Sequence, residues 1–271
     1  MTEAERKQII ALVQREVVPA IGCTEPIAVA LCVAKATETL GAKPEKIDVL
    51  LSANILKNAM GVGIPGTGMI GLPIAIALGA LIGKSEYQLE VLKDSNPAAV
   101  DEGKRFIAEK RINISLKENI SEKLYIEVCC ESGENKATAI IAGGHTTFIY
   151  IARNGGILFS RQNASSEETK EQTVDLTLRK VYDFAMDAPL DEIRFILETA
   201  RLNKAAAESS FDKNYGHGLG RMLRGTYEHK ILGDSVFSHI LSYTSGACDA
   251  RMAGAMIPVS YTHLRAHETV L

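Results

Sequence analysis

The spacing of apolar residues changes twice along this chain, and the change limits the folds that the sequence can adopt. Up to about residue 110 most apolar residues recur at helical intervals, as over residues 72–82 and 97–110, with one strand-like segment at 47–52. The first helix is predicted to begin with a capping box formed by Thr2 and Glu5. Between residues 112 and 159, short segments alternate polar and apolar side chains around tight turns, one of them at residues 133–135. Beyond residue 174 the spacing is helical again, with one helix predicted over residues 191–210. The pattern predicts an α+β fold with helices and a mainly antiparallel sheet, followed by an all-helical domain.

The boundary between these two domains is predicted near residue 162, in a polar and charged stretch typical of a linker. The α+β domain then covers residues 1–162 and the helical domain residues 163–259. Residues 260–271 (Ser-Tyr-Thr-His-Leu-Arg-Ala-His-Glu-Thr-Val-Leu) look like translated sequencing adapter, with an ordinary polar helix as the alternative. We expect a non-native tail there, so its two histidines support no functional prediction.

Charge and hydropathy exclude several kinds of partner. Thirty basic against thirty-three acidic residues leave no basic surface for nucleic acid. Residues 69–82 carry no charge but are too short for a bilayer span and are broken by glycine and proline. The first residues are polar and resemble no secretory signal. We therefore expect a cytoplasmic protein with no membrane or nucleic-acid partner, in which five cysteines without a disulfide spacing are thiols or ligands.

Cys23 is the cysteine with the most informative surroundings. It stands directly before a predicted helix start, with Thr24 as the expected cap. Free backbone N–H groups and the positive end of the helix dipole favour a thiolate there, which can act as a nucleophile or a metal ligand. Glu25 adds a carboxylate within reach of whatever Cys23 holds. On spacing alone, a capping segment whose cysteine fills space is the simpler interpretation.

A glycine-rich segment follows a short predicted helix. Residues 61–66 (Gly-Val-Gly-Ile-Pro-Gly) match the dinucleotide fingerprint, but no strand precedes them and proline interrupts them. We favour a cradle for a small anion such as a substrate carboxylate, in which Gly63 and Gly66 let backbone amides converge and Thr67 adds a hydroxyl. Lys57 supplies positive charge, and Asn54 and Asn58 share one helix face with the loop.

Three further segments carry groups capable of chemistry, each with a structural alternative. His145 lies in a glycine turn between two predicted strands and can transfer protons, or it is a turn residue without a role. The segment 214–221, which ends at Arg221, either lines a site or simply connects helices. Asp249 and Arg251 form an expected ion pair. The sequence has no Walker motif, zinc quartet, pyridoxal-type lysine motif or nucleophile elbow.

Taken together, these segments resemble the L-cysteine desulfidase family, which is related to the iron–sulfur L-serine dehydratases. The resemblance runs in order through Ile21-Gly22-Cys23-Thr24-Glu25-Pro26 and residues 52–73, 143–146, 214–221 and 249–252, and the first two are specific. It implies a [4Fe-4S] cluster held by three cysteines, with one iron open to the substrate. Cys23 matches the family's N-terminal cysteine. The others belong to a C-terminal region absent here, so we expect a truncated helical domain and an inactive fragment.

The resemblance also implies breakdown of L-cysteine to pyruvate, ammonia and hydrogen sulfide by β-elimination. Cys248 stands where a small residue such as serine is expected and is treated as incidental. The alternatives are an L-serine or L-threonine dehydratase and a non-enzymatic domain that binds small carboxylates. Expected partners are an amino-acid substrate and, as an option, a second copy of the chain. The predicted ligand is Cys23, the predicted catalytic residues are Glu25 and His145, and the predicted substrate-binding residues are Thr24, Asn54, Lys57, Asn58, Gly63, Gly66, Thr67 and Arg221.

Overall fold

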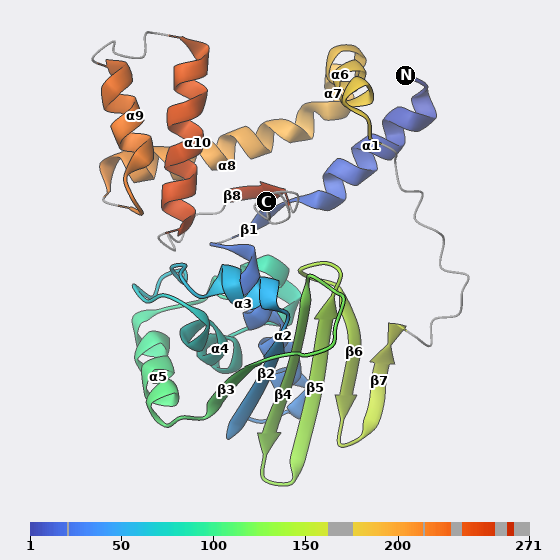
Figure 1. Cartoon of the computed structure of the whole chain (residues 1–271), viewed down its shortest axis with the longest axis vertical. Helices are drawn as coiled ribbons and strands as arrows, with labels where there is room; N and C mark the ends of the chain where they lie inside the picture. The colour runs from blue at the N-terminus through green and yellow to red at the C-terminus, as the bar shows by residue number, and fades with distance from the viewer. Residues whose placement is uncertain (21, 162–175, 214, 229–234, 253–258, 263–271) are drawn as a thin grey trace.

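The computed structural model of the chain contains a mixed α/β region and a helical region (Figure 1). It describes residues 1–20, 22–161, 176–213, 215–228, 235–252 and 259–262. The predicted linker after residue 161 lies almost wholly outside these ranges. In the described part of the chain, no helix has both the length and the apolarity needed to cross a membrane.

A six-stranded sheet forms the centre of the first region, with strand order β3-β2-β4-β5-β6-β7. The pair β2–β3 is parallel and the other four pairs are antiparallel, so the predicted α+β class with a mainly antiparallel sheet is confirmed. The strands are β2 (Lys46–Leu51), β3 (Ile112–Leu116), β4 (Tyr125–Ser132), β5 (Asn135–Ala142), β6 (Phe148–Arg153) and β7 (Gly156–Ser160). In β4 buried residues alternate with partly exposed ones, which is typical of a sheet with one covered face.

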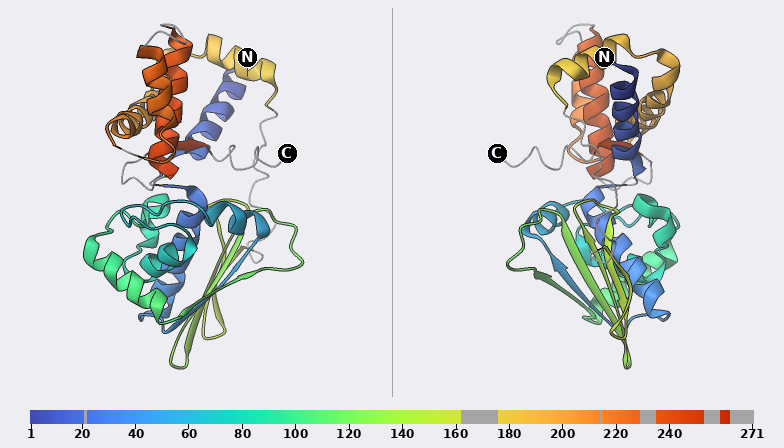
Figure 2. Two further views of the ribbon diagram at one scale, coloured as in Figure 1. Left: turned by 60° about the vertical axis from the view of Figure 1, so that its left-hand side comes forward. Right: turned by 90° about the vertical axis from the view of Figure 1, so that its right-hand side faces the viewer.

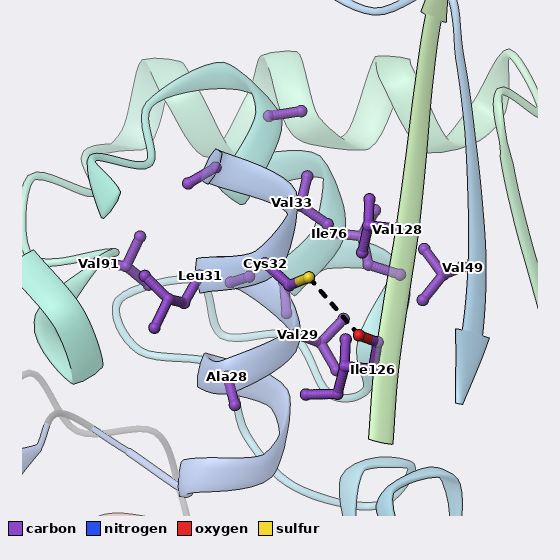
Figure 3. Close-up of a cluster of buried hydrophobic side chains, with 14 of the residues drawn as sticks. Ala28, Val29, Leu31, Cys32, Val33, Val49, Ile76, Val91, Ile126 and Val128 are labelled. Atoms are coloured by element: carbon purple, nitrogen blue, oxygen red, sulfur yellow. Dashed lines mark hydrogen bonds between the residues drawn. The ribbon is translucent and has the colours of Figure 1, made fainter. Parts of the chain in front are cut away.

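Helices cover that face of the sheet (Figure 2). They are α2 (Thr24–Leu40), α3 (Ala53–Ala59), α4 (Leu72–Leu81) and α5 (Pro97–Ala108), with the short 3-10 helix η1 (Ser85–Glu90). Helix α2 is apolar almost all round because it lies between the sheet and α4. Figure 3 shows Cys32 of α2 among Val128 and Ile126 of β4. Its thiol contacts the carbonyl oxygens of Ala139 and Ile126, at 3.3 and 3.8 Å. Cys32 is therefore a core residue.

Close contact between α2 and α4 depends on a glycine. A Cβ atom built on Gly79 would lie 2.6 Å from the carbonyl oxygen of Ala30, a distance that real Cβ contacts do not show. The two helix backbones thus touch at this point, and the predicted buried helix at residues 72–82 packs by its backbone as well as its side chains. Both helices have several completely buried residues on either side of the contact.

The helical region consists of α6 (Leu178–Asp187), α7 (Leu190–Ile193), η3 (Arg194–Ile196), α8 (Leu197–Asp212), α9 (Leu219–Glu228) and α10 (Val236–Met252). The single helix predicted for residues 191–210 is wrong in its first turn, because a 3-10 segment separates α7 from α8. Helices α9 and α10 cross at two glycines. A Cβ on Gly220 would come within 2.3 Å of the Gly246 nitrogen.

The N-terminal helix α1 (Glu3–Glu16) packs on this helical region, although it begins the predicted α+β domain. Its capping box is present as predicted, with Thr2 and Glu5 bonded reciprocally. Ile9 packs with Phe184 of α6 and Ala188. Arg6 donates both Nε and Nη2 to the carboxylate of Glu192, at 2.7 and 3.1 Å. The α+β region is therefore bounded on both sides in sequence by elements of the helical region.

The predicted non-native tail begins inside a two-stranded sheet. Strand β8 (Val259–Thr262) pairs antiparallel with β1 (Val17–Ala20), in a register that places Ala20 opposite Val259 and Val17 opposite Thr262. Residues 260–262 thus have backbone partners in the described structure. Residues 263–271, with the two tail histidines, lie outside it.

Candidate functional site

The start of α2 is the centre of the candidate site, and its cap differs from the prediction. Cys23, not Thr24, is the N-cap residue, and its side chain makes no capping hydrogen bond. Gly22 precedes it with φ +86°, a left-handed conformation that favours glycine. A Cβ on Gly22 would lie 2.7 Å from Cγ of Pro65. The glycine-rich loop therefore packs directly beside the residue before Cys23, and it does so through the ring of Pro65.

The carboxylate of Glu25 is held by two neighbouring side chains. Glu25 is only 7% exposed. The Thr24 hydroxyl donates to Oε2 at 3.3 Å, and the Asn58 amide donates to Oε1 at 3.4 Å. Thr24 and Asn58 were predicted to bind substrate, but here they position Glu25. Helix spacing alone could not show the contact with Asn58, because Glu25 and Asn58 lie on different helices, 33 residues apart in the sequence.

Cys23 is 8% exposed, and its surroundings oppose the predicted thiolate. Burial raises the pKa of its thiol to about 11, while the positive charge of Arg251 acts in the opposite direction. Glu25 and Cys248 raise the pKa further. The helix dipole favours the thiolate, but removal of water from around the sulfur disfavours it more strongly, and the sequence does not show how deeply the sulfur is buried. These interactions also bring Arg251 and Cys248 of α10 into the neighbourhood of Cys23, a role that sequence analysis had not assigned to either.

The predicted anion cradle is a compact hairpin that uses much of its own hydrogen-bonding capacity. The Ile64 amide donates to the Met69 carbonyl and the Gly71 amide to the Val62 carbonyl, while Gly63 forms a bridge with Ile70. Thr67 donates its hydroxyl to the Ile64 carbonyl at 2.8 Å and accepts from the Met69 amide at 2.9 Å. Thr67 thus stabilises the loop. Gly66 is exposed at its turn, with φ +69°. The loop follows α3 rather than a strand, unlike a dinucleotide site.

Helix α3 carries the remaining polar residues predicted near the loop. Ser52 caps it by accepting from the Ile55 amide. Asn54 is partly buried, and Lys57 is exposed and has no ion pair among the described residues. The role of Lys57 in binding a substrate carboxylate stays a prediction.

His145 lies in the turn between β5 and β6, 3% exposed. Figure 1 places this turn at the same end of the sheet as α3 and the start of α2. The turn that holds His145 therefore lies at the end of the α+β region where Cys23 begins α2.

Two predictions in the helical region have different outcomes. The expected pair of Asp249 with Arg251 is wrong, because Asp249, 7% exposed, accepts instead from the backbone amide of Gly220 at 2.9 Å. This bond fixes the start of α9 against α10. Arg221 is exposed at that helix start, and its predicted role in substrate binding stays a prediction. Asn214 lies outside the described residues.

The described residues contain no group of three or more His, Cys, Asp or Glu side chains that could hold a metal ion. Cys32 and Cys130 are buried in the core, and Cys129 is partly exposed on β4. Cys23 is thus the one candidate ligand that combines a helix start with a neighbouring buried carboxylate in this part of the chain.

Comparison with known proteins finds relatives that share a single family name. Over 259 residues, 96% of the chain, the sequence is 81% identical to a protein of Bacteroides fragilis. Over the same length it is 75% identical to a protein of Bacteroides thetaiotaomicron, and over 265 residues 47% identical to one of Porphyromonas gingivalis. These relatives are UPF0597 proteins.

The chain spans about 60% of the length of these UPF0597 relatives. No family model matches the chain. No solved structure matches it either. The UPF0597 name states no substrate and no activity, so the chemistry of the full-length protein is a matter for proposal.

Proposed function

We propose that the full-length protein is a lyase that breaks L-cysteine down to pyruvate, ammonia and hydrogen sulfide, in the manner of the L-cysteine desulfidases that the sequence resembles. One observation carries the proposal. Cys23, the fixed carboxylate of Glu25 and the positive charge of Arg251 lie together at the buried start of α2, where two regions of the chain meet. Such a group of side chains suits a small zwitterionic substrate from which a base must remove the α-proton.

The family resemblance implies a [4Fe-4S] cluster, and the described residues do not fit one by themselves. Such a cluster needs three or four thiolate ligands. Near Cys23 the structure shows one further thiol, that of Cys248, and no group of three donors among the described residues. If Cys23 is a ligand, the remaining ligands come from the part of the full-length protein that this chain does not match. No step below depends on the cluster.

The residues present support the proton transfers of a β-elimination. A base removes the α-proton of cysteine, the bond between Cβ and sulfur breaks, and the sulfur leaves as hydrosulfide. The resulting aminoacrylate tautomerises and reacts with water to give pyruvate and ammonia. Glu25 is the first candidate for the base, because its two oxygens are held in place by neutral donors beside Cys23. His145 is the second candidate.

The function is tested with the full-length relative from Bacteroides fragilis, reconstituted anaerobically with iron and sulfide. After removal of excess sulfide, we expect equal amounts of pyruvate and hydrogen sulfide from L-cysteine, measured over time. Pyruvate from L-serine or L-threonine but no sulfide from L-cysteine would establish the dehydratase alternative instead. Binding of amino acids without any product would favour a carboxylate-binding domain and contradict the proposal.

Lys57 provides a separate prediction for substrate binding. If its ammonium group holds the substrate carboxylate, Lys57→Met in the full-length enzyme should raise KM for cysteine roughly ten- to hundredfold and change kcat less. Lys104→Met, on the exposed side of α5, is the matched control and should leave KM unchanged. An equal KM in the Lys57 variant and the parent would remove Lys57 from the site.

A further inference from the structure

The helical region buries far fewer apolar side chains than the α+β region and exposes more of them. The core of the α+β region is one large cluster that includes buried residues of α2, α4 and the three strands β2, β4 and β5. The buried clusters of the helical region contain only Ile9, Phe184 and Ala188 in one case and Ala206 and Ala250 in the other. Yet thirteen of the twenty large apolar side chains that the described structure exposes lie between residues 176 and 240.

Some of these exposed residues form a stripe on α6. Leu178, Tyr182 and Met186 follow one another at four-residue spacing, and they are 87%, 57% and 66% exposed. The same helix already buries Phe184 against α1 and carries an ion pair between Arg179 and Asp183, at 2.9 Å, on its solvent side. The guanidinium of Arg179 also lies over the ring of Tyr182, 5.8 Å from its centroid, so the charged pair borders the stripe. None of the three stripe residues belongs to a buried apolar cluster of the described structure.

A second stripe lies at the start of α10. Val236, Phe237 and Ile240 are 76%, 71% and 56% exposed. The far end of the same helix is packed, with Ala250 buried against Ala206 of α8. Helices of soluble proteins expose single large apolar residues but seldom whole stripes of them, and such stripes mark surfaces that another element covers.

The length of the relatives identifies the covering element. About 40% of each UPF0597 relative lies outside the match, whereas the core of the α+β region is already closed. We propose that the α6 stripe (Leu178, Tyr182, Met186) and the α10 stripe (Val236, Phe237, Ile240) are covered in the full-length protein by apolar faces of that remaining part of its own chain. This inference is independent of the proposed reaction.

The test compares thiol labelling at three positions of matched exposure. Met186→Cys and Phe237→Cys place a thiol in each stripe, and Leu158→Cys places one on the edge strand β7, where Leu158 is 66% exposed. Each change is made in this chain and at the matching position of the full-length Bacteroides fragilis relative. Maleimide labelling is followed peptide by peptide with mass spectrometry, so that native cysteines do not interfere. Buried Cys32 reports whether the α+β region is folded.

We expect positions 186 and 237 to react at least tenfold more slowly in the full-length protein than in this chain, and position 158 to react equally fast in both. Equal rates at all three positions of the full-length protein would overturn the proposal, even if this chain failed to fold. Protection at 186 and 237 that disappears on dilution, together with a change from dimer to monomer in light scattering, would assign the stripes to a second copy and also overturn it.

Discussion

Replacing Cys23 with serine in the reconstituted full-length protein should lower bound iron, bleach the visible absorption and reduce sulfide release more than about a hundredfold. Serine is close to cysteine in size, and the site is a polar helix start, so the fold should survive the change. Iron content, absorption and sulfide release are measured on the same sample. The expected result depends on the proposed role of Cys23 as a ligand.

Other outcomes assign Cys23 a different role. Full iron content without turnover would make Cys23 a nucleophile, and nearly normal iron and turnover would make it a structural residue. Normal iron in the variant contradicts the ligand assignment whatever the activity. Cys129→Ser is the matched control, because Cys129 is partly exposed on β4 and lies outside the candidate site. It should keep both iron and activity.

The largest effect on stability is expected at the contact between α2 and α4. In Gly79→Ala the new methyl group would lie 2.6 Å from the backbone oxygen of Ala30, and a backbone oxygen cannot rotate away. Overpacking of this kind costs about 1–3 kcal/mol, more than the roughly 1 kcal/mol by which alanine is the better helix residue. We therefore expect a lower free energy of unfolding, measured by chemical denaturation of this chain. An unchanged or higher value would mean that the helices can move apart at little cost.

Gly103→Ala is the control for this prediction. Gly103 also lies inside a helix, α5, of the same region. A Cβ there would lie 3.0 Å from the end of the Ile74 side chain and in ordinary contact with the side chains of Leu78 and Ala77, at 3.6 and 3.7 Å. Because the end of a side chain can move, the close contact should cost little stability. The gain from the higher helix propensity of alanine should nearly offset this cost, so the free energy of unfolding should change by less than about 1 kcal/mol. The difference between the two variants then measures the rigidity of the backbone contact.

Local signals in the sequence predicted local structure well. The capping box at Thr2 and Glu5 is present. The predicted turn at residues 133–135 joins β4 and β5 in a tight hairpin. Alternating residues between 112 and 159 correctly indicated strands. In each of these cases the partners lie within a few residues of one another, so spacing alone carries the information.

Features that depend on distant partners could not be predicted in this way. No local pattern shows that β3 lies parallel to β2, or that α1 packs on the helical region. The same limit applied at the site. Thr24 and Asn58 contact Glu25, Thr67 bonds within its own loop, and Asp249 bonds the Gly220 amide instead of Arg251. Residue types suggested which side chains matter, but the tertiary fold decides which of them meet.

The position of α1 has a consequence for how the protein is made. Arg6 and its partner Glu192 are separated by 186 residues, and the whole α+β region is synthesised between them. On the ribosome, the sheet and its helices can therefore close while the apolar side of α1, with Ile9, is still without its partner. Helix α1 is thus synthesised before the α+β region but docks only after its partners in the helical region have been made. Until then its apolar side is a defined target for a chaperone that binds short apolar segments.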